Sequence, residues 1–543
     1  MKPPLCWFLL LFLLCCVVAP AQDQEAVQRP YLGKGTDAVQ LFVDGKPFLS
    51  RGGELGNSSA SNMDYLRSFW PKLASLNLNT VLAPVYWELM EPVEGQFDFT
   101  LLDTLIHSAR RHDLRLVLLW FGSWKNSMSC YAPAWVKQNQ KRFPRSRISD
   151  GEALEILTPF CEENLQADSR AFAALMRHIK EVDARQGTVI MIQVENEIGM
   201  IPQARDHCEQ AEWAFSRAVP SELLRYLAEH KEKLHPHLVD AWKRMGFPSA
   251  GTWEAVFGKG VHTDELFMAW HFARYVDHVA QAGKTVHPLP MYVNAALIRP
   301  GYQPGQYPSA GPLPHLIDLW RAGAPQIDFL SPDIYFDTFA EWCSRYDLPG
   351  NPLFIPEVAM TQSPANAFYA IAQHAALGYS PFSIESLTGR EKERLAQAYD
   401  LLRQLEPLIV ANQGSGRMVG VLLDSARQES RFTLGDFVFI VRHEHSWAYA
   451  QREPGPTPRY GGMILQLSED EFLIAGVGLV VQLAVAKDKK AKAGITAIDE
   501  GSLVDGRWVA GRRLNGDQSH QGRHVQLPGQ AYTVVKVKLY HYR

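Results

Sequence analysis

The sequence of 543 residues predicts an α/β fold, a (β/α)8 TIM barrel followed by a smaller all-β C-terminal domain. Eight short β-like runs alternate with helical patterns between residues 46 and 386, which is typical of repeated βα units around a parallel sheet. After residue 413 the pattern changes to short alternating strands separated by turn residues. The expected organisation is therefore a leader at 1–21, a barrel at 22–412 and a β-rich domain at 413–543.

The first 21 residues have the features of a signal peptide, with an apolar run over residues 5–18 and a small-x-small cleavage site at Ala19-Pro20-Ala21. They predict export of the protein, to the periplasm or out of the cell. A lipid-attachment site at Cys15 or Cys16 is the alternative, which the bulky Leu14 disfavours. No other run approaches the roughly 18–20 apolar residues that cross a bilayer, so no membrane span is expected.

The barrel elements follow in chain order from runs such as "TVLAPVYW" for strands and "LLDTLIHSARRH" for helices. The eight strands are expected at residues 48–54, 80–87, 114–120, 189–195, 289–294, 329–335, 353–358 and 380–385. Helices are expected at 65–75, 101–112, 169–184, 263–282, 366–376 and, as the last barrel helix, 392–411. An insertion at about 208–261 separates the fourth and fifth strands and is expected to form a rim or lid.

The composition is that of an ordinary globular protein, with 46% hydrophobic and 21% charged residues. A formal net charge of −4 provides no basic surface for nucleic acid. No cofactor or metal is predicted, because neither the His235 and His237 pair nor the His443-Glu444-His445 run has a third ligand at metal spacing. Four cysteines lie outside the leader without a CxxC motif, and the sequence favours none of their three pairings. They are Cys130, Cys161, Cys208 and Cys343.

Polar and aromatic side chains close the eight strand runs. In a (β/α)8 barrel the carboxyl ends of the strands meet on one face, which is where active sites lie. A single such residue is ordinarily a solvated loop side chain, but eight strand ends of this kind favour a site. The residues are Glu54, Trp87, Glu88, Trp124, Lys125, Asn126, Asn196, Glu197, Asn294, Tyr335, Glu357 and Glu385.

Two of these carboxylates have the pattern that glycoside hydrolysis requires. Glu197 ends the fourth strand and Glu357, in "NPLFIPEVAM", ends the seventh. A retaining glycosidase needs one carboxylic acid and one nucleophilic carboxylate about 5–5.5 Å apart. Alternation along a strand puts Glu195 and Glu197 of "QVENEIG" on the same side, so strand geometry leaves open which of them is used.

Several motifs make residues 40–405 resemble glycoside hydrolase family 35, and among its members the shorter bacterial β-galactosidases, some of which trim xyloglucan oligosaccharides. The motifs are "GGELGNSSA", "YWELMEPVEGQFDF", "QVENEIG" and the later "PEVA". The second motif, and "APAW" at 132–135, also resemble family 42 β-galactosidases. The third strand ends in "WFGSWKN", where many family 35 members carry a Gly-Pro-Tyr and acidic stretch, so the sugar pocket is expected to differ.

The resemblance implies a retaining exo-β-galactosidase that acts on oligosaccharides with terminal β-galactose. The glutamate after the asparagine is the family's proton donor, which corresponds to Glu197, and the nucleophile corresponds to Glu357. Another exo-β-glycosidase of the same clan, either family 42-like or a glucosidase, and an inactive carbohydrate-binding barrel are the alternatives. A homodimer is left open.

The remaining candidates are expected to bind substrate or to support the two glutamates. Tyr335 is expected to donate a hydrogen bond to Glu357, and the resemblance implies that Asn196 binds the sugar 2-hydroxyl. Trp87 and Trp124 are expected to present ring faces to the sugar. The other residues expected to bind hydroxyl groups are Glu54, Lys125, Asn126 and Glu385.

Overall fold

The computed structural model describes residues 28–424, 426–443, 459–488, 490–514 and 516–543. The predicted leader at 1–21, and Glu444 and His445 of the histidine run, lie outside the described residues. No helix within the described ranges is long and apolar enough to cross a membrane. The four cysteines beyond the leader are free thiols, so none of the three pairings is present.

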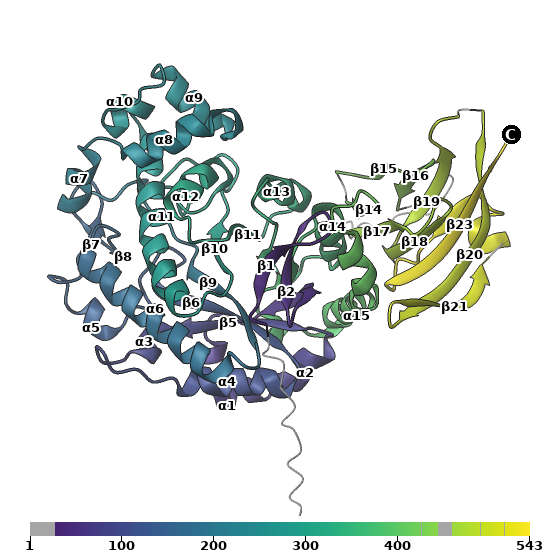
Figure 1. Cartoon of the computed structure of the whole chain (residues 1–543), viewed down its shortest axis with the longest axis horizontal. Helices are drawn as coiled ribbons and strands as arrows, with labels where there is room; N and C mark the ends of the chain where they lie inside the picture. Colours follow the sequence, from purple (N-terminus) through teal and green to yellow (C-terminus); the bar gives the residue numbers. More distant parts are fainter. Residues whose placement is uncertain (1–27, 425, 444–458, 489, 515) are drawn as a thin grey trace, which may run out of the picture.

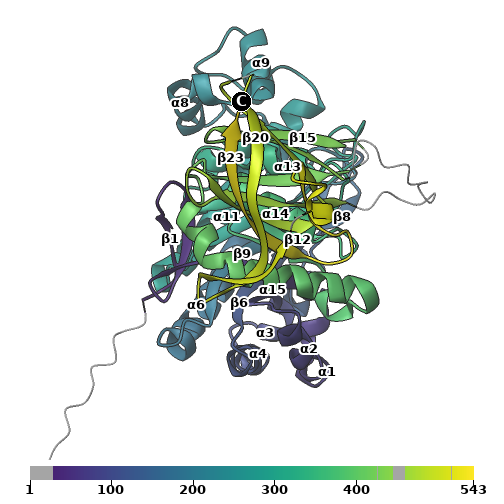
Figure 2. The same cartoon turned by 90° about the vertical axis from the view of Figure 1, so that its right-hand side faces the viewer.

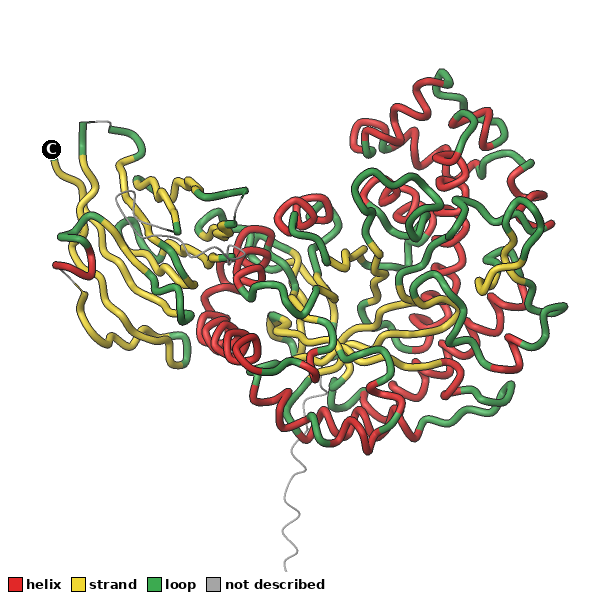
Figure 3. The backbone as a smooth tube through the Cα atoms, turned by 180° about the vertical axis from the view of Figure 1, so that it is seen from behind, coloured by secondary structure: helices red, strands yellow, loops and turns green. Residues whose placement is uncertain are grey.

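Eight parallel strands close into a barrel, which confirms the predicted fold class (Figures 1 and 3). Consecutive barrel strands along the chain are neighbours in the barrel, and the last strand, β13, pairs with the first, β4, to complete the ring. The strands are β4 (Ser50–Glu54), β5 (Thr80–Tyr86), β6 (Arg115–Lys125), β9 (Val189–Asn196), β10 (Met291–Ala296), β11 (Phe329–Ile334), β12 (Ile355–Val358) and β13 (Gly378–Pro381).

The barrel strands are buried along nearly their whole length because helices cover them outside and side chains fill the barrel inside. Every residue of β5 and of β9 is buried. Two strand ends differ from their expected positions, since β6 continues to Lys125 instead of ending at 120 and β13 ends at Pro381 instead of 385. Ser383 then adopts a left-handed conformation with φ 53°, and Glu385 lies in the short 3-10 helix η4 (Ile384–Ser386).

Helices surround the barrel, and the expected helix at 65–75 forms as two short ones, α1 and α2. The helices outside the insertion are α1 (Met63–Arg67), α2 (Trp70–Ser75), α3 (Trp87–Met90), α4 (Thr100–Arg111), α5 (Ala134–Lys137), α6 (Glu162–Asp183), α11 (Val261–Val286), α12 (Ile317–Gly323), α13 (Phe339–Tyr346), α14 (Ala365–His374) and α15 (Gly389–Asn412). Small antiparallel sheets, β1 (Tyr31–Lys34) with β2 (Val39–Val43) and β3 (Lys46–Phe48), and β7 (Arg145–Arg147) with β8 (Ala153–Leu157), flank the barrel.

The insertion between β9 and α11 is helical, as expected. It contains α7 (Glu209–Phe215), α8 (Ser221–Glu229), α9 (Pro236–Arg244) and α10 (Trp253–Phe257). These helices stand at the edge of the molecule beside α11 and α12 (Figure 1), and α8 contacts α12 while α10 contacts α11. The insertion therefore packs on the outside of the helical layer.

The C-terminal strands form two antiparallel sheets on the opposite side of the barrel from the insertion (Figures 1 and 2). The six-stranded sheet has the order β14-β17-β18-β23-β20-β21 and the four-stranded sheet the order β15-β16-β19-β22. The strands are β14 (Met418–Leu423), β15 (Glu429–Leu434), β16 (Phe437–Arg442), β17 (Tyr460–Gln466), β18 (Glu471–Val477), β19 (Val480–Val485), β20 (Lys492–Val504), β21 (Arg507–Leu514), β22 (His524–Gln526) and β23 (Thr533–Tyr542).

The larger of these sheets packs directly against a barrel helix. β14 and β17 contact α14, and Phe368 of α14 stacks on Tyr532 with ring centroids 5.5 Å apart. Met418, Leu465 and Val534 belong to the same hydrophobic core as the barrel residues. The six-stranded sheet thus adds side chains to the barrel's hydrophobic core, while a second core lies between the two C-terminal sheets.

Candidate active site

Four carboxyl groups converge at the carboxyl ends of β4, β9, β11 and β12. Glu54, Glu197, Asp333 and Glu357 are all buried, at 1–7% exposure. Repulsion between them raises the pKa of Glu54 and of Asp333, after the larger effect of burial. Lys125, at the end of β6, opposes this rise in both groups, which places its ammonium beside the carboxyl cluster.

Tyr335 forms a hydrogen bond with Glu357, as predicted from the positions of both residues at strand ends. The Tyr335 hydroxyl donates a hydrogen bond to Glu357 Oε1. The Glu54 carboxyl lies beside Glu357, whose charge adds to the effect of burial in raising the pKa of Glu54. The Tyr335 hydroxyl thus fixes the position of one Glu357 oxygen, which a nucleophile requires.

Glu197 has the environment of a proton donor. Burial, and then repulsion from Glu357, raise its pKa from 4.5 to about 7, while Lys125 acts in the opposite direction. Its backbone N–H donates to Asn294 Oδ1 at 3.0 Å, and Asn294 Nδ2 donates to Asp333 Oδ2 at 2.6 Å. A carboxyl group with a pKa near neutrality can both give and take a proton at physiological pH.

The two glutamates of "ENE" lie in different places. Glu195 Oε2 accepts the Trp124 backbone N–H at 2.7 Å, and its carboxyl lies beside Asp168 of α6, behind the barrel wall. Glu195 and Glu197 both have positive φ, 60° and 45°. The chain has therefore left regular strand geometry, so the alternation rule no longer places these two side chains on one side.

Several buried polar atoms at this end of the barrel have no hydrogen-bond partner among the described residues. They include Glu54 Oε1, both amide atoms of Asn196, Asp333 Oδ1 and Glu357 Oε2. Burying such groups unpaired costs roughly 1–3 kcal/mol each, so clusters of them mark places where a polar ligand or water completes the bonding. Their arrangement suits a ligand rich in hydroxyl groups.

Three further predicted residues lie at the rim of this cluster. Lys125 is buried, with its ammonium 5.2 Å from the centroid of the Phe121 ring. Asn126 is exposed, and its backbone N–H donates to Asn196 O at 3.2 Å. Glu385 accepts from the Gly56 N–H at 3.0 Å and from Ser59 Oγ at 2.5 Å, so its carboxylate orders the loop after β4.

The prediction that Trp87 and Trp124 present ring faces to a sugar is wrong. Both side chains have 0% exposure. Trp87 begins α3 and donates to Glu91 Oε2 at 2.7 Å, and Trp124 donates to Leu157 O at 3.1 Å. Trp124 also packs on Tyr275 of α11, with ring centroids 4.5 Å apart, so both indoles belong to the layer behind the strands.

Sequence reasoning missed Asp333 and assigned no role to Asn294. Asp333 lies inside β11 in "FLSPDIY", two residues before Tyr335, so alternation places both on one face. An acid within an otherwise apolar strand was the signal available. Asn294 similarly interrupts the apolar run of β10.

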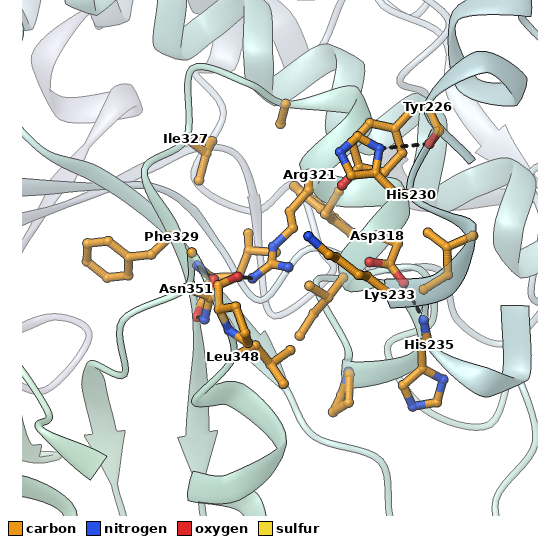
Figure 4. Close-up of a pocket in the computed structure, with 18 of the residues that line it drawn as sticks. Tyr226, His230, Lys233, His235, Asp318, Arg321, Ile327, Phe329, Leu348 and Asn351 are labelled. Atoms are coloured by element: carbon orange, nitrogen blue, oxygen red, sulfur yellow. Dashed lines mark hydrogen bonds between the residues drawn. The ribbon is translucent and has the colours of Figure 1, made fainter. Parts of the chain in front are cut away.

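One cavity lies apart from the four carboxyl groups, and another adjoins Glu357. A cavity of about 640 Å³ between the insertion and α12 is lined by Tyr226, His230, Lys233 and Arg321, and none of the four carboxyl groups lines it (Figure 4). A cavity of about 510 Å³ is lined by Tyr335 and therefore adjoins Glu357. Within the described ranges no group of three or more potential ligand side chains could hold a metal ion.

Comparison with known proteins gives two family matches. Residues 67–255 match the glycoside hydrolase family 42 model, described as β-galactosidase, and residues 395–526 match a domain of unknown function. A β-galactosidase from Xanthomonas manihotis is 29% identical over 189 residues, which are 33% of this chain and 28% of that protein. The chain thus spans less than a third of the length of this curated relative.

A solved structure extends the likeness to the fold of nearly the whole chain. A catalytic mutant of a family 42 β-galactosidase from G. stearothermophilus has a TM-score of 0.50 at 11% identity, covering 90% of this chain and 98% of that one. The family 35 membership implied by the motifs is not shown, since the matching model is that of family 42. Residues 67–255, which include Glu197, are thus similar to β-galactosidases of family 42.

Proposed function

We propose that the protein is a retaining exo-β-galactosidase with Glu357 as nucleophile and Glu197 as acid/base. The observation that carries this proposal is the contrast between the two groups. Glu357 accepts a hydrogen bond from Tyr335, whereas burial and repulsion raise the pKa of Glu197 to about 7. A pair of carboxyl groups with unlike environments is what acid and nucleophile require.

In the proposed first step, the Glu357 carboxylate attacks the anomeric carbon while Glu197 protonates the departing glycosidic oxygen. In the second step, Glu197 removes a proton from water, the water oxygen attacks the anomeric carbon, and the bond to Glu357 breaks to release galactose. Asn196 and Asp333, whose buried polar atoms lack partners among the described residues, would bind sugar hydroxyl groups.

The test is a panel of aryl glycosides. Wild type is expected to hydrolyse the β-galactoside and not its 4-epimer, the β-glucoside. Glu357→Gly is expected to lose this hydrolysis and, with added azide, to form the inverted galactosyl azide, because azide replaces the missing carboxylate. Wild-type turnover retained by this variant would refute the nucleophile. Binding of galactosides by wild type without release of the aryl group would favour the inactive barrel instead.

The sequence motifs further support membership of family 35, cleavage of xyloglucan-derived oligosaccharides and export through the leader at 1–21. A homodimer stays open. Product analysis on galactose-bearing xyloglucan oligosaccharides beside lactose tests the substrate, and release of galactose from neither would refute it. N-terminal sequencing of the mature protein tests cleavage after Ala21.

A further inference from the structure

The cavity of about 510 Å³ lies over the carboxyl ends of β11, β12 and β13, next to the proposed catalytic centre. Tyr335 is part of both the catalytic centre and the cavity, because its hydroxyl donates to Glu357 and its side chain lines the cavity. The volume falls within the roughly 300–1,000 Å³ of small-molecule sites. A sugar unit joined to the galactose in the catalytic centre could therefore occupy it.

Three arginines line this cavity. Arg390 and Arg394 lie one turn apart on α15, which puts them on one face of the helix, and Arg459 comes from the segment before β17. Two acids, Asp337 and Glu391, also line it, so the described residues of the lining carry a net charge of one positive (three minus two).

The acids do not neutralise the two arginines of α15. Asp337 Oδ1 pairs with Arg459 Nη2 at 2.9 Å, whereas Arg390 and Arg394 form no ion pair with any described residue. Arg394 Nη2 is buried without a hydrogen-bond partner among the described residues, and this guanidinium also lies beside Tyr532. Tyr532 stacks on Phe368, so the arginine is adjacent to a packed part of the core. A buried guanidinium nitrogen without an acceptor is best satisfied by an anionic oxygen.

We propose that this cavity, the Arg390–Arg394 subsite, binds the oxyanion of an acidic sugar unit linked to the galactose, either the carboxylate of a uronic acid or a sulfate ester. Guanidinium groups match the planar carboxylate and the sulfate oxygens through paired, charge-assisted hydrogen bonds. The proposal rests on the proposed function for its position along the substrate. Its chemistry follows from the cavity itself.

The first experiment measures binding without hydrolysis. Methyl β-D-glucuronide, glucose 6-sulfate and neutral methyl β-D-glucoside are titrated into the whole protein by calorimetry. At least one acidic ligand is expected to bind about tenfold or more tightly than the neutral one, since a charge-assisted bond is worth roughly 1.5–3 kcal/mol. Which of the two binds identifies the carboxylate or the sulfate as the group recognised. Equal affinity for all three ligands overturns the subsite, whether or not galactosides are cleaved.

Variants assign the effect to the two arginines. Arg390→Gln and Arg394→Gln are expected to remove the preference for the acidic ligand, and Arg390→Gln, at an exposed position, keeps the test valid if Arg394→Gln unfolds. Arg403→Gln is the matched control, because Arg403 lies on the same helix, is 54% exposed and pairs with Asp400. An acidic preference that persists in Arg390→Gln and in a folded Arg394→Gln contradicts the proposal.

The second experiment links the subsite to turnover. For wild type, kcat/KM on galactose β-linked to glucuronate is compared with that on lactose, and the ratio is expected to fall towards one in Arg390→Gln. A ratio that the substitution leaves unchanged overturns the link. If wild type cleaves no galactoside at all, including the aryl β-galactoside, the proposed function fails, and the calorimetric result decides the subsite separately.

Discussion

At the scale of single residues, the site depends on two glutamates separated by one asparagine. Glu195 lies behind the barrel wall beside Asp168, which accepts from Trp120 Nε1 at 2.9 Å and from Ser123 Oγ at 2.6 Å. Glu197 faces Glu357 and Lys125. Both carboxyl groups are buried. Of the two, Glu197 is the one that lies beside Lys125 and faces the Glu357 carboxylate, an arrangement in which it can exchange a proton with a substrate.

The pH dependence of activity follows from the raised pKa of Glu197. The protonated form gives the proton, so kcat/KM for an alkyl galactoside is expected to fall as pH rises through about 7. Activity measured from pH 5 to 9 checks this, and the alkaline fall should be absent in Glu197→Gln acting on an activated aryl galactoside, whose leaving group needs no proton. A wild-type profile that stays flat to pH 9 would contradict the assignment.

The same group affects stability with a definite sign. A carboxyl whose pKa is 4.5 when unfolded and about 7 when folded binds its proton more tightly in the folded state. Its contribution to stability is therefore present below pH 4.5 and is lost as pH rises to about 7. Denaturation of Glu197→Gln should lack this part of the pH dependence.

The buried Glu195 should behave as a neutral side chain. Burial, and then the charge of Asp168, raise its pKa well above the ordinary value. Glu195→Gln keeps the size and an oxygen acceptor for the Trp124 N–H, so the free energy of unfolding is expected to change by less than about 1 kcal/mol, against about 2–3 kcal/mol lost in Glu195→Ala. Urea denaturation measures both. Equal losses would show that a charged Glu195 is required.

At the scale of elements, the first barrel strand is tied to the last barrel helix. Arg51 of β4 forms an ion pair with Glu406 of α15, and Arg51 Nε donates to Asn77 O at 3.2 Å. The Arg51 side chain is 7% exposed. The pair joins the two ends of the (β/α)8 sequence, where no covalent connection closes the ring.

Removing the acid from this pair should destabilise the barrel. Glu406→Ala leaves the buried Arg51 guanidinium without its partner, which is expected to cost about 2–3 kcal/mol in the free energy of unfolding. Glu393→Ala, at an exposed position on the same helix, is the matched control and should change it by less than about 0.5 kcal/mol. Comparable losses in the two variants would mean that the ion pair contributes nothing specific.

The elements were largely predictable because their signals are local. Strand runs such as β5 and β9 are continuous apolar segments, and a parallel sheet covered on both faces requires such segments. The residue at which a strand ends was less predictable. Ser383 has a positive φ where the chain leaves β13, and the Glu385 carboxylate two residues later accepts from the Gly56 N–H in the loop after β4.

At the scale of the whole molecule, the six-stranded C-terminal sheet packs into the barrel's core, while the two C-terminal sheets enclose a second core between them. Phe368 and Tyr532 stack across the contact, and Leu465 and Val534 pack with barrel residues. We expect one calorimetric unfolding transition for the whole chain, because separating the sheet from the barrel would expose the apolar side chains of this contact. Two transitions separated by several degrees would contradict this expectation.

From the sequence alone, the order of strands and helices and the identity of Glu197 and Glu357 as strand-end carboxylates could be predicted, because periodicity and strand ends are written along the chain. The tertiary structure decided which candidates meet. It placed Asp333 among the carboxyl groups and removed Trp87 and Trp124 to the layer behind the strands. Side-chain direction at a strand end depends on backbone torsions and on neighbours from distant segments, and positive φ at Glu195 and Glu197 shows where local alternation stops being a guide.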